Sequence, residues 1–184
     1  MFTVKKRRFQ KMKNVQLIVS KRAVSKVMKD FLVAVDKSCG GDGSLVSLHQ
    51  DSQFAAVMYD ESPELHEITY NLSQLLESGT DYNTGLGVVA ANMGKRASYM
   101  KGFSQVVRVL LHEFGHHMTY STIIALYGED EITRLYREAK GSNEKYLHVP
   151  TEWVATQWAI NWLADAENRK IAREFERKFW ACFD

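Results

Sequence analysis

At residues 112–116 the chain reads His112-Glu113-Phe114-Gly115-His116, inside a mostly apolar run. Residues four apart on a helix lie one turn above each other on the same face, so the two imidazoles would point at one place. Glu113 stands directly beside the first of them. Two histidines at this spacing with an adjacent glutamate are typical of a zinc site that activates water. The stretch therefore predicts a metal-binding helix.

The composition is that of an ordinary globular protein. The 184 residues are 45% hydrophobic and 25% charged, and they include only two prolines. We expect a basic tail over residues 1–14 and a single domain over residues 15–184, which is long enough to bury a core. The net charge of +2 is too small to indicate a nucleic-acid partner by itself.

The cysteines and the apolar runs predict a cytoplasmic protein. Cys39 and Cys182 lie near opposite ends of the chain and form no CxxC pair, which favours two free thiols over a disulfide. The apolar runs are too short for a transmembrane span, and the early one near Val15 is interrupted too soon for a signal peptide. We therefore expect no membrane partner.

The order of elements predicts an α+β fold. Apolar spacing indicates a helix over residues 20–37, and three candidate strands follow over residues 44–49, 53–59 and 65–71. We expect a small, mostly antiparallel sheet of about three strands, with the first two joined by a short turn. The sheet would pack with the motif helix, over residues 103–126 and ending at Gly128, and with a glutamate-bearing helix that starts near Pro150.

The third metal ligand decides which kind of zinc site this is, because a catalytic zinc usually has three protein ligands. Metzincins place a histidine six residues after the second motif histidine, where this chain has Thr122. Glu152 instead opens an apolar helix, where a buried carboxylate is costly unless it meets a cation. Ala155 and Gly115 would allow the two helices to approach closely. The alternatives are His148 as the ligand, or Glu152 as an exposed first-turn residue favoured by the helix dipole.

These residues resemble the ImmA/IrrE-like metallopeptidases, which are gluzincins with an HExGH helix and a later helix of the form ExxAxxxAxxLL. The matching positions after the motif are Glu152, Ala155, Ala159 and Leu163, with Thr156 where the family usually has Asn or a similar polar residue. The resemblance implies a zincin-like metallopeptidase fold over residues 15–184. It also implies one Zn²⁺ bound by the two motif histidines and Glu152.

The resemblance further implies a metallopeptidase that cuts a protein or peptide partner. Glu113 would act as the general base on a water activated by the zinc. Tyr146 and His148, just before the glutamate-bearing helix, and Tyr120 are candidates for stabilising the oxyanion. The strand nearest the cleft, expected at residues 65–71, would bind the substrate backbone by strand addition.

Two alternatives stay open. The first is a non-catalytic interaction or nucleic-acid-associated protein that keeps the zincin scaffold, with nucleic acid bound through the basic N-terminus at Lys5, Lys6, Arg7 and Arg8. The second is a protease of DNA-bound proteins similar to the SprT group. That group uses a third histidine, and His148 is the only histidine that follows the motif.

Overall fold

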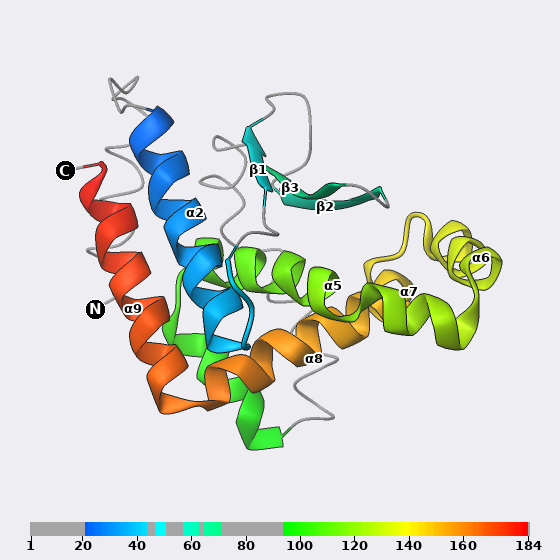
Figure 1. The fold of residues 1–184 in the computed structure, drawn as a ribbon. Coiled ribbons are helices and arrows are strands. Elements are labelled where there is room, and N and C mark those ends of the chain that lie inside the picture. The colour runs from blue at the N-terminus through cyan, green and yellow to red at the C-terminus, as the bar shows by residue number, and fades with distance from the viewer. Residues whose placement is uncertain (1–20, 44–46, 51–56, 63–64, 71–93, 184) are drawn as a thin grey trace.

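A computed structural model describes residues 21–43, 47–50, 57–62, 65–70 and 94–183 of the chain (Figure 1). The basic residues 1–14 and the glycine-rich stretch before residue 94 lie outside this part of the chain. Its elements are, in order, α2 (Lys21–Ser38), β1 (Ser47–Gln50), β2 (Val57–Ser62), β3 (Leu65–Tyr70), the 3₁₀ helix η1 (Gly94–Gly102), α5 (Gln105–Tyr127), α6 (Glu129–Ala139), α7 (Asn143–Leu147), α8 (Pro150–Ala164) and α9 (Ala166–Ala181).

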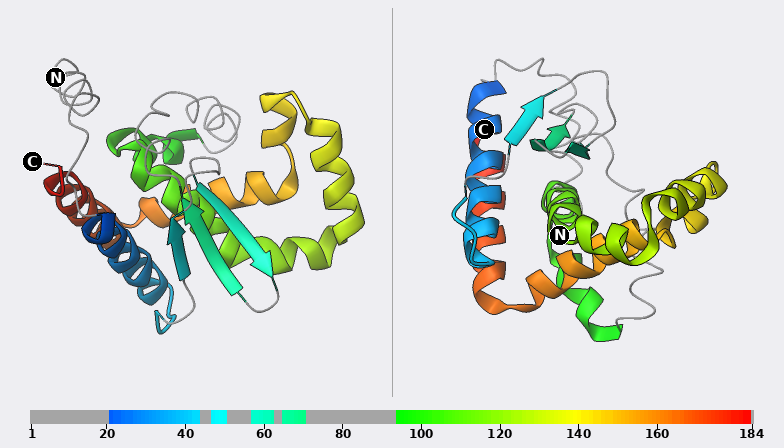
Figure 2. Two further views of the ribbon diagram at one scale, coloured as in Figure 1. Left: turned by 90° about the horizontal axis from the view of Figure 1, so that it is seen from above. Right: turned by 45° about the vertical axis from the view of Figure 1, so that its right-hand side comes forward.

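Helices α2 and α9 lie side by side and run in opposite directions (Figures 1 and 2). Five apolar positions of α2 recur at helical spacing and are buried, as the sequence predicted. They are Val24, Met28, Phe31, Leu32 and Val35. Phe31 stacks on Phe175 of α9 with ring centroids 4.2 Å apart and meets Trp162 of α8 edge-on. Aromatic packing therefore joins these three helices.

Helices α5 and α8 form the central pair and pack directly on each other (Figure 1). Most residues of α5 from Val106 to His116 are buried, because this part of the helix is apolar on nearly every side. Helix α5 ends at Gly128, whose φ of 82° is the left-handed conformation that glycine adopts without strain. Helix α8 begins with Pro150 in its first turn. Both boundaries confirm the sequence-based expectation.

Three short strands form a sheet in the order β1-β3-β2. β3 pairs with β1 in parallel, with Ser47 opposite Glu67, and with β2 antiparallel, with Val57 opposite Tyr70. β2 and β3 contact α5, and β1 contacts α2. The sheet thus lies against the motif helix, over one side of the helical core (Figure 2).

The expected α+β fold with a mostly antiparallel sheet is wrong, because the described part of the chain is predominantly helical. Its strands contain only four, six and six residues. Of the strand residues whose burial is described, only Ile68 and Tyr70 enter the core, and helices supply the rest of it. The first two strands were expected to pair as a hairpin, but β3 lies between them. Its pairing with β1 is parallel, so only one of the two strand pairings is antiparallel.

Helices α6 and α9 lie outside the central pair. Helix α9 is amphipathic and buries Ala172, Phe175 and Phe179, while α6 projects away from the central pair (Figure 2). Cys39 and Cys182 are both free thiols, as predicted. Among the described helices, none is both long enough and apolar enough to cross a lipid bilayer.

Candidate metal centre

Helix α5 presents the two motif histidines on the face that meets α8. The rings of His112 and His116 lie with centroids 4.6 Å apart, and their Nε2 atoms are 3.1 Å apart. Each residue is only 7% exposed. The 3.6-residue period of the helix explains this convergence, since the side chains leave the helix one turn apart on one side.

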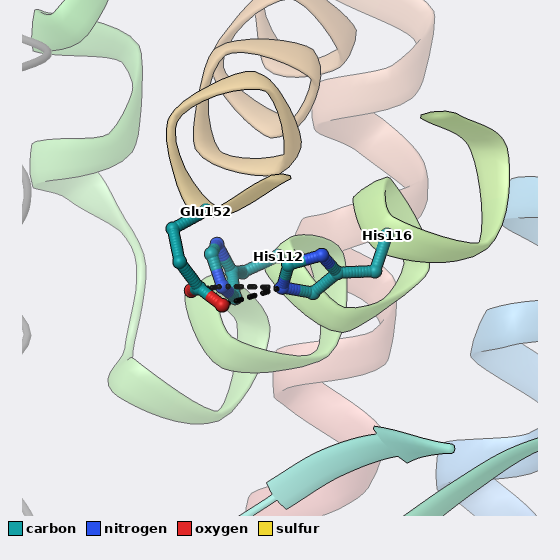
Figure 3. A group of neighbouring side chains, drawn as sticks. All are labelled: His112, His116 and Glu152. Carbon is teal, nitrogen blue, oxygen red and sulfur yellow. Dashed lines mark hydrogen bonds and ion pairs between the residues drawn. The ribbon is translucent and has the colours of Figure 1, made fainter. Parts of the chain in front are cut away.

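Helix α8 supplies the carboxylate from its first turn. Glu152 is 5% exposed and points toward both imidazoles (Figure 3). Its Oε2 lies 3.1 Å from Nε2 of His112, and its Oε1 lies 3.6 Å from Nε2 of His116. The alternative of an exposed residue favoured by the helix dipole is therefore wrong for Glu152.

The spacing of these three groups suits a metal ion. Tetrahedral ligands at bond lengths of about 2.0–2.1 Å are separated by about 3.3 Å, which is the edge of the tetrahedron. The three closest separations here are 3.1, 3.1 and 3.6 Å, and ligand atoms of all three residues lie within 4.8 Å of one another. His112, His116 and Glu152 thus form a buried group that can hold a metal ion.

Electrostatics favour an ionised carboxylate at this place. Burial by itself would raise the pKa of Glu152, but the hydrogen bonds and charge of His112 and His116 hold it well below the usual value. A buried carboxylate beside two imidazoles is costly to desolvate unless positive charge balances it. The group therefore attracts a cation, and a divalent metal supplies that charge without needing a proton on either imidazole.

Close packing of α5 on α8 brings the ligands together. A Cβ atom added to Gly115 would lie 2.4 Å from the backbone oxygen of Ala155 and 3.0 Å from its Cα atom. Such contacts are sterically forbidden, and the obstacle is backbone rather than a flexible side chain. Only glycine fits here, so the close approach expected between Gly115 and Ala155 is confirmed.

Neighbouring hydroxyl groups hold two of the ligands in place. Nδ1 of His112 lies 2.9 Å from Oγ1 of Thr156, a buried residue one turn after Glu152. The hydroxyl of Tyr136, on α6, donates to Oε1 of Glu152 at 2.5 Å and lies 2.7 Å from Oγ1 of Thr151. Partners of this kind orient metal ligands in known sites.

Comparisons with family models, curated proteins and solved structures found no match. The interpretation of this centre therefore depends on the chain's own residues and on their geometry.

Glu113 and Tyr146 lie beside the metal-binding group. Glu113 follows His112 on α5 and is 9% exposed. Tyr146, on α7, is 43% exposed and stacks obliquely with Tyr136 at a centroid distance of 5.7 Å. Partial burial raises the pKa of Tyr146, and the carboxylates of Glu152 and Glu113 raise it further. The Tyr146 hydroxyl therefore keeps its proton and remains a donor close to both carboxylates.

His148 lies apart from the three converging ligands. It caps the C-terminal end of α7 and is exposed. With Leu135, Glu138, Ala139, Lys145 and Val149 it lines a cavity of about 250 Å³ between α6 and the start of α8. Among the described residues, the metal-binding group contains Glu152 in place of His148. Tyr120, the third candidate for the oxyanion, lies on α5 one turn after His116.

Sequence reasoning missed the residues that support the ligands. Tyr136 has the spacing of a helix residue that faces the core, and nothing in its neighbourhood indicates a bond to Glu152, which is 16 residues away. Thr151 stands next to Glu152 but carries no motif. Thr156 likewise gave no sign in the sequence of its contact with His112.

Proposed function

We propose that this protein is a zinc-dependent metallopeptidase of the gluzincin type. The observation that carries the proposal is the convergence of His112, His116 and Glu152, with Glu113 next to the first ligand on the same helix. A purely structural metal site is normally closed by four protein ligands, whereas a catalytic site has three and leaves room for water. The three-ligand set supports a catalytic centre.

Zinc is the metal that this donor set favours. Two imidazole nitrogens and one carboxylate suit zinc, whereas magnesium and calcium prefer sites made of oxygen atoms alone. When bound, Zn²⁺ supplies Lewis acidity, which lowers the pKa of a coordinated water toward ~7 and polarises a carbonyl group. With Nε2 of His112 bound to the metal, its Nδ1–H would donate to Oγ1 of Thr156, which lies 2.9 Å away and can accept it.

Glu113 would move the proton in this reaction. Its carboxylate accepts a proton from the attacking water as the water oxygen bonds to the peptide carbonyl carbon. The same carboxyl group then gives that proton to the amine as the C–N bond breaks. The products are one free amine and one free carboxylic acid, which releases its proton to the solvent, and Glu113 returns to its starting state. Its position one residue after His112 places it on an adjacent side of the helix.

Tyr146 is better placed than His148 to donate to the oxyanion. Its protonated hydroxyl lies near Glu113 and Glu152, on the side from which α7 approaches the centre. His148 lines the neighbouring cavity, where it would contact substrate groups rather than the reacting carbonyl. Charge that develops on the carbonyl oxygen is stabilised by donors that are already oriented. Tyr146 is therefore assigned to this role.

The substrate in this proposal is an extended segment of a protein or peptide. The strand at Leu65–Tyr70, first expected to bind it, is the central strand β3 and pairs on both edges. Its backbone groups are thus already used. β2 pairs with β3 along one edge and, of the two strands that contact α5, it makes the more extensive contact with this helix. A substrate that adds to the sheet would lie along β2.

Zinc content and cleavage of a protein substrate, measured on the same preparations, test the proposal. The wild-type protein should hold one zinc per chain and cut denatured casein. His112→Ala and Glu152→Ala should lose both properties. Glu113→Gln should keep the zinc and lose cleavage by about 100-fold or more, as expected when a general base is removed.

A control variant distinguishes effects on the metal site from general effects of substitution. Glu144→Gln changes an exposed acid on α7 and should leave zinc content and cleavage at wild-type values. Absence of zinc from a wild-type preparation made without chelators contradicts the metal site. Cleavage by Glu113→Gln at the wild-type rate contradicts the role of Glu113 as the base. Wild-type protein that holds zinc but cleaves none of a panel of unfolded proteins contradicts the assignment as a peptidase.

A further inference from the structure

Tyr136 links a peripheral helix to the metal ligand on α8. It lies on α6, outside the α5–α8 pair, yet its hydroxyl is the atom closest to Glu152 among the measured contacts of that carboxylate. The hydroxyl also lies 2.7 Å from Oγ1 of Thr151, which is fully buried. Two consecutive residues at the start of α8 are thus bonded by one tyrosine.

The arrangement divides the two oxygens of Glu152 between different partners. Oε1 accepts the Tyr136 hydroxyl at 2.5 Å, while Oε2 lies nearest to His112. A carboxylate held by one oxygen cannot rotate freely about its last torsion angle, so its second oxygen stays directed at His112. Without such a partner, the carboxylate would lose rotational freedom each time it binds a metal ion, and this loss weakens binding.

We propose that Tyr136 is a positioning residue of the metal centre, which fixes the Glu152 carboxylate and thereby couples the docking of α6 to metal affinity. The inference rests on the metal occupancy contained in the proposed function, and it does not require peptide hydrolysis. Tyr136 contacts the ligand and not the metal or a substrate. Its effect should therefore be seen in binding before any reaction takes place.

The coupling works in both directions. Helix α6 is held to α5 and α7 by few contacts, and its outer face carries the exposed ion pairs of Arg134 with Glu131 and Glu138. Such exposed pairs add little stability. The bond from Tyr136 to Glu152 adds a polar attachment to the buried Ile132 and Ala139 of α6. Metal binding that orders Glu152 should therefore also order α6.

The test is the Zn²⁺ dissociation constant of Tyr136→Phe, measured by competition with a chromophoric chelator on the full chain. Loss of a ligand's hydrogen-bond partner typically weakens metal binding by about 10- to 100-fold. The visible absorption of the Co²⁺-loaded protein should also shift, because it reports the arrangement of ligands around the ion. Thr151→Val, which removes the other partner of the hydroxyl, should give a smaller loss in the same direction.

Tyr127→Phe is the matched control, because Tyr127 is 51% exposed at the end of α5. It should keep the wild-type dissociation constant and Co²⁺ spectrum. If Tyr136→Phe leaves both properties unchanged, the proposal is overturned. A lower melting temperature of its metal-free form would then show only a structural role for Tyr136. If the wild-type protein binds Zn²⁺ but cuts no substrate, only the proposed peptidase activity is refuted. If it binds no Zn²⁺, both the peptidase activity and the role of Tyr136 are refuted.

Discussion

Two pairs of packed helices in this molecule are held together in different ways. Helices α2 and α9 meet through aromatic rings, with Phe31 stacked on Phe175. Helices α5 and α8 meet at Gly115 and enclose the buried polar group of His112, His116 and Glu152. Burial of apolar side chains stabilises the first interface, whereas the second carries a charge that needs a partner.

The two interfaces have different roles: one stabilises the fold and the other forms the metal-binding group. Apolar packing contributes whether or not a ligand is present, so α2 and α9 form a permanent frame. The polar interface gives up part of that stability in order to hold two imidazoles and a carboxylate at metal-binding distance. We therefore expect substitutions in the frame to change the free energy of unfolding without changing metal affinity, and substitutions in the centre to change metal affinity.

The largest effect is expected from Phe31→Ala in the frame. Phe31 is 3% exposed, and removing its ring leaves a cavity between three helices. The free energy of unfolding should fall by about 3–5 kcal/mol in urea denaturation of the metal-free protein. The folded fraction should still bind one zinc with the wild-type dissociation constant. A weakened metal affinity would contradict the independence of the two interfaces.

Gly115→Ala should damage both stability and metal binding. The new Cβ would overlap the backbone of Ala155, so α8 must move and carry Glu152 with it. We expect a loss of about 2–3 kcal/mol, measured by urea denaturation, together with loss of stoichiometric zinc. Gly102→Ala is the control, because a Cβ at Gly102 has only a side-chain atom of Arg173 near it, at 3.9 Å. Equal zinc content in the two variants would contradict the close-packing argument.

Removing the metal should destabilise the polar interface selectively. At free Zn²⁺ of about 100 times the dissociation constant, binding adds about 2.7 kcal/mol to stability. The melting temperature should therefore rise by about 5–10 °C when Zn²⁺ is added to chelated protein. Glu152→Gln should abolish this rise, while Phe31→Ala should retain it. A rise of the same size in Glu152→Gln would place the stabilising metal elsewhere.

The smallest effect is expected from Thr156→Val, which keeps the volume of the side chain but loses the oxygen near Nδ1 of His112. Zinc affinity should weaken by about 10-fold, with little change in the metal-free melting temperature. Thr122→Val, on the exposed side of α5, serves as the comparison in the same chelator competition. Equal affinities for the two variants would show that Thr156 does not orient His112.

The long helices and the motif ligands could be predicted from the sequence, whereas the order of the strands and the supporting residues could not. The boundaries of α5 and α8 follow from local signals at Gly128 and Pro150. The position of β3 between β1 and β2 has no local signal, because pairing depends on contacts between distant residues. The contact between Tyr136 and Glu152 also depends on how α6 folds back after α5 ends.

The sequence by itself determined that His112 and His116 share one helix face, because helical spacing is a property of the local backbone. It also pointed to Glu152 as a carboxylate in apolar surroundings. Only the tertiary structure decided that these three meet, since their convergence requires Gly115 to admit the backbone of Ala155. Local geometry fixes which atoms are available, and the packing of α5 on α8 fixes the distances between them.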